Sequence, residues 1–379
     1  MNRSQQIAIL LDLLRIPGAS GDEDHVAAFI QQAIERLGYP GISPICDGAG
    51  NVVLALEGDD QRGRRLFTAH MDTIDLCVGA EPLMEGDRII NRNPNSGLGA
   101  DNRTGCAVLL AVLGELCASG RPHAPLTFAW TVKEEVGQRG AQLLDLELAG
   151  QPSHGFNFDG GTSTKITHGA YGKSEIRIEV LGVAAHAGNN PASGANAVVV
   201  ASRIASAVHR LSQSIARGAE PILINVARIE GGGALNVIPA HAVISIEVRS
   251  FDIAARQMLF QKIEDLTLRL IRRASQEALP RISAHVSARD LYPPFQLKRD
   301  DMCCGLMARA VTECGATPTY SIGRGGTDAN QLNVRGIPSV SLGCGQRETH
   351  SLKEYVDLSS FYQACDIALR LAAQPILAL

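Results

Sequence analysis

The hydrophobic and polar positions at the start of the chain follow first the spacing of helices and then that of buried strands. Residues 5–14 and 25–37 repeat apolar side chains at helical intervals. Residues 105–117 are too long and too rich in alanine for a strand, so they predict a helix that crosses over a sheet. Short apolar runs bounded by polar or glycine segments predict buried strands at 52–56, 65–69 and 126–132. The first third therefore predicts an α/β fold.

The pattern changes at residue 171. Charged and aliphatic residues alternate from 172 to 183, as in a strand with one solvated face, and a helical pattern follows at 196–214. Two more strands are expected at 222–229 and 242–249, then a helix at 254–273 and a last strand at 281–287. The order β-α-β-β-α-β is that of a small open-faced sandwich with two helices on one side.

The α/β pattern returns after this segment. Helical spacing is seen at 302–314 and 362–373, on either side of a buried strand at 338–343. We therefore assign residues 1–170 and 289–379 to one discontinuous catalytic domain, and residues 171–288 to a domain inserted into it.

Composition and charge exclude several classes of protein. With 45% hydrophobic and 20% charged residues the chain is globular, and a net charge of −4 without a basic stretch argues against nucleic acid as a partner. No apolar run reaches the length of a membrane span, and Asp12 and Arg15 interrupt the N-terminal one. The 9 cysteines are scattered without a C-x-x-C pair, which favours reduced thiols. We expect a cytoplasmic protein with no membrane partner.

Ionisable side chains follow the predicted strands of the catalytic domain. His70 ends one strand, and Asp72 stands two positions later, a spacing that suits a metal ligand with a carboxylate beside it. Asp101 comes directly before the crossing helix, where a helix N-cap is the ordinary role of an aspartate. Glu134 and Glu135 follow the apolar run that ends in Thr-Val-Lys. Open α/β sheets bind ligands at the carboxyl edge where such residues would meet.

Two further residues complete this set. Asp159 ends the run Phe-Asn-Phe, and His350 lies in a polar loop after the strand at 338–343. Singly, a turn aspartate and an exposed histidine are the simpler interpretations. Together, two divalent cations and one hydroxide would balance the charges of Asp101, Glu135 and Asp159. A mixed nitrogen and oxygen ligand set suits zinc, with cobalt or manganese as alternatives.

The motifs HMD, ADNRTG, KEEVG, FDGG and ETH occur in this order along the chain. They resemble the metal-site signature of the dinuclear zinc metallopeptidase family that includes peptidase T, carboxypeptidase G and aminoacylase. The segments AAHAGNNPASGANAV and ALNVIPAHAVISIEVRS of the insert are also similar to that family. The resemblance implies a zinc-exopeptidase-like α/β catalytic domain with an inserted ferredoxin-like lid domain, through which such chains form homodimers.

The resemblance also implies a ligand set for two Zn²⁺ ions. His70 and Asp159 would bind one metal, Glu135 and His350 the other, and Asp101 would bridge the two.

Two neighbouring acids receive catalytic roles from the same resemblance. Asp72 would stand behind His70, and Glu134 would be the general base for a metal-bridging water that attacks the scissile carbonyl.

Four residues are candidates for substrate binding. His186 in AAHAG matches the histidine that stabilises the oxyanion in the family, although alone it would be interpreted as a turn residue. Arg324 in GRGGTDAN resembles the peptidase T branch, where an arginine faces the C-terminal carboxylate of the substrate. Asn236 and Arg249 are weaker candidates, and Arg249 would equally well pair with a surface acid.

The expected function is that of an aminopeptidase or tripeptidase acting on short peptides. The alternatives on the same scaffold are a deacylase of N-acyl amino acids and a carboxypeptidase. From another class, an inactive metal-binding protein whose insert serves assembly would not need the complete set of ligands together with Glu134 and Asp72.

A second resemblance points to a related family. EEVGQRGA and DNRTG are also similar to large dodecameric dinuclear-metal aminopeptidases, which insert a β-rich domain before DNRTG. The segment between His70 and Asp101 is too short for such a domain, and the insert follows Asp159. The position of the insert therefore favours the peptidase T side.

Overall fold

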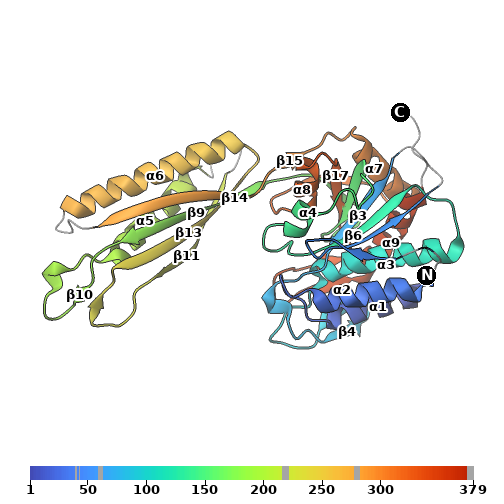
Figure 1. The fold of residues 1–379 in the computed structure, drawn as a ribbon, viewed down its shortest axis with the longest axis horizontal. Coiled ribbons are helices and arrows are strands. Elements are labelled where there is room, and N and C mark those ends of the chain that lie inside the picture. The colour runs from blue at the N-terminus through green and yellow to red at the C-terminus, as the bar shows by residue number, and fades with distance from the viewer. Residues whose placement is uncertain (39–40, 42, 59–62, 216–221, 277–281, 374–379) are drawn as a thin grey trace. The chain divides into compact units, whose positions relative to one another are not determined.

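The computed structural model describes the chain apart from residues 39–40, 42, 59–62, 216–221, 277–281 and 374–379 (Figure 1). It divides into two compact units, Met1–Ala170 with Phe295–Leu379, and Tyr171–Pro294. We call them the catalytic unit and the inserted unit. The boundary predicted at residue 288 lies too early, because it falls inside strand β14 (Ser283–Tyr292), which stays paired with β9 (Gly172–Leu181) up to Tyr292.

A mixed sheet forms the centre of the catalytic unit. Strands β3 (Arg65–His70), β6 (Leu126–Thr131), β7 (His154–Phe158) and β17 (Ser339–Leu342) run parallel to one another, since β3 pairs with β6 and β7, and β17 pairs with β7. In the described part of the chain the order is β1-β2-β6-β3-β7-β17-β8-β15, with β16 beside β8. The remaining strands are β1 (Ile45–Cys46), β2 (Val52–Leu56), β8 (Lys165–Ala170), β15 (Phe295–Gln296) and β16 (Thr319–Gly323). The predicted strands at 52–56, 65–69, 126–132 and 338–343 are all confirmed.

Helices cover both faces of this sheet because its strands are apolar on both sides. Along β3, Phe67 contributes to the larger core and Leu66 to a smaller core on the other face. The larger core includes residues of α1 (Arg3–Arg15), α2 (Asp24–Arg36), α3 (Ala100–Ser119), α7 (Met302–Glu313) and α9 (Leu358–Ala373). The helices α4 (Arg139–Leu143) and α8 (Asp328–Val334) belong to the other side.

Helix α3 is the predicted crossing helix, and it lies unusually close to the sheet. A Cβ atom added to Gly105 would lie only 2.1 Å from the carbonyl oxygen of Phe158. A glycine is therefore required where the first turns of α3 pass the end of β7. This contact brings Asp101, at the start of α3, close to the residue that follows β7.

A small second sheet lies beside the carboxyl edge of the large one. Its order is β18-β19-β5-β4 in the described residues. The strands are β4 (Pro82–Glu85), β5 (Arg88–Asn91), β18 (Gln346–Arg347) and β19 (Tyr355–Asp357). β19 pairs with β5, so a segment near the C-terminus is joined to the hairpin that precedes Asp101. We did not predict these strands, because runs of two to four residues carry too little periodicity.

The inserted unit has the predicted β-α-β-β-α-β order. Its elements are β9, α5 (Ala197–Ile215), β11 (Leu223–Gly231), β13 (His241–Ser250), α6 (Ile253–Gln276) and β14. The sheet order β11-β13-β9-β14 is antiparallel throughout and agrees with the expected ferredoxin-like topology. Figure 1 shows α5 and α6 along this sheet, and their apolar residues share one core with Ile178 and Ile244. Residue 281, the predicted start of the last strand, lies outside the described residues.

None of the helices in the described ranges combines the length and the apolar character needed to cross a bilayer.

Candidate metal centre

The candidate ligands meet at the carboxyl edge of the parallel strands. His70 is the last residue of β3, Glu134 and Glu135 follow β6, and Asp159 follows β7. His350 lies in the segment after β17. Parallel strands end at the same edge of a sheet, so the fold gathers residues that are far apart in the chain.

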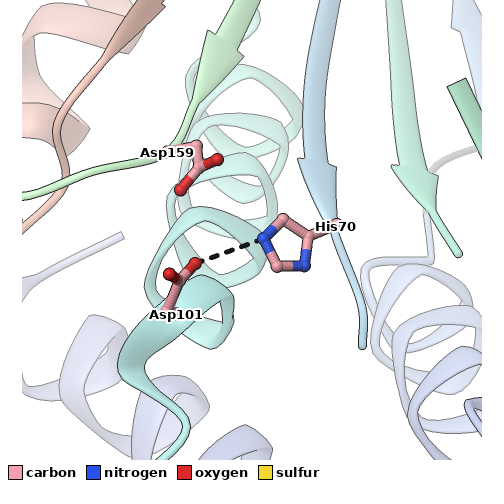
Figure 2. A group of neighbouring side chains, drawn as sticks. All are labelled: His70, Asp101 and Asp159. Atoms are coloured by element: carbon pink, nitrogen blue, oxygen red, sulfur yellow. Dashed lines mark hydrogen bonds and ion pairs between the residues drawn. The ribbon is translucent and has the colours of Figure 1, made fainter. Parts of the chain in front are cut away.

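Two groups of possible ligands share one residue, Asp101. The ligand atoms of His70, Asp101 and Asp159 lie within 4.8 Å of one another, and so do those of Asp101, Glu135 and His350. Figure 2 shows Asp101 and Asp159 on the same side of the His70 ring, with an interaction drawn between His70 and Asp101. His70 Nε2 lies 3.2 Å from Asp101 Oδ1, and His350 Nε2 lies 3.5 Å from Asp101 Oδ2. Each carboxylate oxygen of Asp101 thus faces a different histidine, which is the geometry of a bridging ligand.

The electrostatics of the cluster call for a cation. Burial and then the charge of Asp101 raise the pKa of Asp159 to about 8. Burial also raises the pKa of Glu134, and the neighbouring carboxylates add to this effect. Hydrogen bonds with Asp101 and Glu135 raise the pKa of His350 to about 10. In the protein alone, protons must therefore compensate the clustered negative charges, and divalent cations would take their place.

The donors present fit two zinc ions. The Nδ1 atom of His70 lies 3.0 Å from the backbone oxygen of Asp72, so this nitrogen carries the proton and Nε2 is the ligand atom. His350 approaches Glu135 Oε1 to 3.0 Å through Nε2 as well. Imidazole nitrogens and carboxylate oxygens are a ligand set that zinc accepts, and cobalt and manganese accept it too.

The carboxylate of Asp72 is buried and has more than one partner. It accepts a hydrogen bond from the Ser20 hydroxyl at 2.6 Å, and it accepts the backbone N–H groups of Glu134 at 2.9 Å and Glu135 at 3.1 Å. The N–H of Lys133 donates to Glu23 Oε1 at 3.0 Å. Two buried carboxylates therefore hold three consecutive N–H groups and fix the turn that presents the two glutamates.

The centre is also supported by residues that we did not identify from the sequence. Gln346 donates to Asp159 Oδ1 at 3.3 Å and to Asn102 Oδ1 at 2.8 Å. Glu354 accepts hydrogen bonds from the loop before Asp101. Asp328 is fully buried and accepts a hydrogen bond from the Thr131 hydroxyl, while its Oδ1 has no partner within the described ranges. Asp328 stands in the segment GRGGTDAN and Asn102 in ADNRTG, both singled out from the sequence, but neither residue received a role there.

Two candidates of the inserted unit lie close together, His186 on a short strand and Asn236 directly before the strand that pairs with it. His186 belongs to β10 (Ala185–His186), which pairs with β12 (Val237–Ile238), and the carbonyl of Asn236 accepts the N–H of Ala187 at 2.9 Å. The Nδ1 atom of His186 accepts the N–H groups of Gly188 at 3.2 Å and Asn189 at 3.1 Å. The proton of a neutral His186 is therefore on Nε2, where the exposed ring can donate it.

Arg249 and Arg324 are not brought into either group. Arg249 lies one residue before the end of β13 and pairs with Lys173. His241 begins the same strand and pairs with Leu181, which lies shortly before β10. The Nε of Arg249 donates to Glu247 Oε1 at 2.7 Å, a contact with an acid of the kind expected from the alternative interpretation. Arg324 lies in the exposed loop after β16 of the catalytic unit.

Two family models and several known proteins match this chain. Residues 168–273 match the peptidase dimerisation domain, and residues 88–171 match the M42 glutamyl aminopeptidase family. Carboxypeptidase G2 from Pseudomonas sp. (strain RS-16) is 28% identical over 390 residues, covering 96% of this chain and 88% of that protein. Peptidase T from Pectobacterium carotovorum is 24% identical over 289 residues, covering 76% of this chain and 68% of that protein.

A solved structure of a peptidase has a similar fold. A tripeptidase from Staphylococcus aureus has a TM-score of 0.85 at 24% identity, covering 98% of both chains. The match to the M42 family ends at residue 171, and the match to the dimerisation domain begins at residue 168. This change agrees with the predicted start of the inserted domain at residue 171. The family resemblance that the motifs predicted is therefore confirmed.

Proposed function

This chain is related by sequence and fold to the metallopeptidase family of peptidase T and carboxypeptidase G2, and from that premise we propose that it is a two-metal exopeptidase acting on short peptides. The comparisons support a metal-dependent peptidase at the coarser level. The observation that carries the proposal is Asp101, whose two oxygens face the separate groups that contain His70 and His350.

This geometry supports the ligand roles that the family resemblance implies. His70 and Asp159 would hold one ion, Glu135 and His350 the other, with Asp101 between them. Two Zn²⁺ ions bound there would polarise the scissile carbonyl and lower the pKa of the attacking water. Asp72 fixes the backbone of the turn that contains Glu134 and Glu135. The two glutamates therefore lie together, but their side chains can contact different partners.

Glu134 is the candidate general base. Its carboxylate would accept a proton from the attacking water and return it to the leaving nitrogen as the amide bond breaks. Burial, the first cause of the raised pKa of Glu134, makes its carboxylate a stronger base for that proton. His186 can donate its Nε2 hydrogen to the oxyanion, a role that we assign from the family resemblance.

The substrate class is a short peptide with a free N-terminus. The family branch supports Arg324 as the residue that binds the C-terminal carboxylate of the substrate, with Asn236 as a further contact. The structure gives Arg249 an acidic partner of its own, so it is the weakest of the candidates. A carboxypeptidase or a deacylase of N-acyl amino acids is the second candidate, favoured by the match to carboxypeptidase G2 along 96% of the chain.

A substrate panel with defined metal content tests the proposal. The protein is stripped of metal with a chelator and reconstituted with Zn²⁺, Co²⁺ or Mn²⁺. We expect tripeptides to lose their N-terminal residue only after reconstitution, while N-acetylated peptides and N-acyl amino acids remain intact. Release of the C-terminal residue, or hydrolysis of the acylated compounds, would favour the second candidate. Full peptide cleavage by metal-free protein would exclude both.

A further inference from the structure

Glu354 is a buried glutamate that none of the roles above uses. Only 3% of its surface is exposed, and it lies between His350 and strand β19. Its Oε2 accepts the backbone N–H groups of Leu98 at 2.9 Å and Gly99 at 2.6 Å, and its Oε1 accepts that of Asp101 at 3.1 Å. One side chain thus binds three N–H groups of the loop that carries the shared aspartate.

The loop is shaped to bring its backbone close to this carboxylate. Gly99 has a φ of +77°, a conformation that favours glycine, and a Cβ added to Gly97 would lie 2.9 Å from Cys77 Sγ and 3.4 Å from Glu354 Oε2. The Cys77 thiol lies 3.6 Å from the same Oε2 atom. Both glycines are needed for the loop to wrap around the Glu354 carboxylate.

The small sheet holds the two segments in register. β19 follows Glu354 directly and pairs with β5, which precedes the loop that ends at Asp101. β18, on the other side of the His350 segment, pairs with β19. The chain around His350 and the chain around Asp101 are therefore joined twice, through the sheet and through Glu354.

From these contacts we propose that Glu354 is a positioning residue that sets the Asp101 carboxylate between the two metal positions and ties it to the His350 segment. The inference rests on the proposed metal centre but not on the substrate. Without these hydrogen bonds the backbone at Asp101 would be free to shift, and one carboxylate oxygen of Asp101 would no longer be held where a metal ion could bind it. The ion held by Glu135 and His350 depends most on this contact, because His350 is half exposed.

Both carboxylate oxygens of Glu354 accept hydrogen bonds, which explains why a glutamate and not a glutamine occupies position 354. A glutamine has one acceptor oxygen, and its amide N–H₂ would face an N–H group on one side or the other. If the glutamine oxygen takes the pair from Leu98 and Gly99, the amide opposes the N–H of Asp101. Glu354→Gln therefore perturbs Asp101 while the size of the side chain is kept.

Cobalt binding to the full chain tests the proposal. Metal-free wild type, Glu354→Gln, Glu354→Asp and the control Glu348→Gln are titrated with Co²⁺ and followed by visible absorption. Glu348 is exposed and lies in the same segment as His350. We expect two Co²⁺ per wild-type chain, and in Glu354→Gln a second Co²⁺ bound about 10–100-fold more weakly with an altered spectrum. Glu354→Asp, which keeps two oxygens, should recover part of the affinity, and Glu348→Gln should match wild type.

The outcomes separate this inference from the proposed function. A merely structural role would lower the melting temperature of metal-free Glu354→Gln and leave the affinity and spectrum of the folded protein unchanged, which would overturn the proposal. A wild type that binds no Co²⁺ would overturn both. A wild type that binds two Co²⁺ but hydrolyses no peptide would refute the exopeptidase, while the comparison of the variants would still decide the role of Glu354.

Discussion

Two adjacent glutamates, Glu134 and Glu135, lie in one turn, and this turn allows their side chains to have different roles. The Asp72 carboxylate accepts both of their backbone N–H groups, and Glu23 accepts the preceding one. With the backbone fixed in this way, Glu135 reaches the His350 group, whereas Glu134 is not a member of either ligand group. The side chains can therefore serve as ligand and as base.

We predict that Glu134→Gln keeps two metal ions and loses turnover. The amide cannot take a proton from water, so kcat should fall about 10²–10⁴-fold. Metal content by elemental analysis and steady-state kinetics on a tripeptide measure the two quantities. Glu135→Gln is the matched comparison and should lose metal as well as turnover. If Glu135→Gln kept both ions and lost only turnover, the two roles would be reversed.

We predict that Asp72→Asn weakens both metal binding and catalysis. An asparagine keeps one acceptor oxygen for the turn at Glu134 and Glu135, and places an amide against one of the two N–H groups. Metal affinity should fall about 10–100-fold, as for other residues that orient ligands. Ser20→Ala removes only one hydrogen bond to the same carboxylate and should have a much smaller effect. Equal losses in the two variants would contradict this account.

Among single residues, the motifs predicted the candidate metal ligands and the candidate base. The ligand set from His70 to His350 could be proposed because histidines and acids follow apolar runs. Glu23, Gln346 and Glu354 could not, because they act on backbone N–H groups or side chains that only the fold brings to them. A single glutamate in a polar segment carries no signal of such a contact.

Between elements, the contact of α3 with β7 controls the site. A Cβ atom added at Gly105 would lie 2.1 Å from the carbonyl oxygen of Phe158, so any larger residue pushes the helix away from the strand. Asp101 begins that helix and Asp159 follows that strand. Their separation is therefore set by the absence of a side chain at residue 105.

We predict that Gly105→Ala destabilises the protein by about 1–3 kcal/mol and also weakens metal binding. Gly305 is the control, since it too lies within a helix, and a Cβ added there meets nothing within 4 Å. Gly305→Ala should stabilise by up to about 1 kcal/mol, the difference in helix propensity. Urea unfolding and a metal titration measure both effects. Unchanged metal affinity in a folded Gly105→Ala protein would show that the helix adapts without moving Asp101.

The longer elements could be predicted because their patterns extend over several residues. The two N-terminal helices, α3 and the strands of the inserted unit agree with expectation to within a few residues. The sheet that contains β18 and β19 was not predicted, since its strands are two and three residues long. Tertiary contacts, rather than local sequence, decide such strands.

In the whole molecule each unit has a core of its own. The core of the inserted unit contains residues of β9, β13, α5 and α6, and the large core belongs to the catalytic unit. The chain enters and leaves the inserted unit through neighbouring residues, because Ala170 and Phe295 pair with each other in the β8–β15 ladder. An antiparallel pair of this kind can be closed by a two-residue turn.

We predict that replacing residues 171–294 with Asn-Gly leaves a folded catalytic unit that binds two metal ions but hydrolyses no peptide, because His186 and Asn236 are lost. The full chain should sediment as a homodimer and the shortened one as a monomer, since the removed part contains the segment matched to the dimerisation domain. Circular dichroism, cobalt titration and analytical ultracentrifugation check this. Peptidase activity in the shortened chain would show that the inserted unit is not needed for catalysis. A shortened chain that is still dimeric would show that the dimer contact lies in the catalytic unit.

The pairing of Ala170 with Phe295 also bears on how such a chain arose. Seen from the catalytic unit, everything between these two residues occupies the place of a hairpin loop. One insertion at a loop tip is enough to add a second domain at such a place, and the sheet on either side does not have to change. The same junction offers protein engineers a graft point, at which the inserted units of different relatives can be exchanged without changing the sheet on either side.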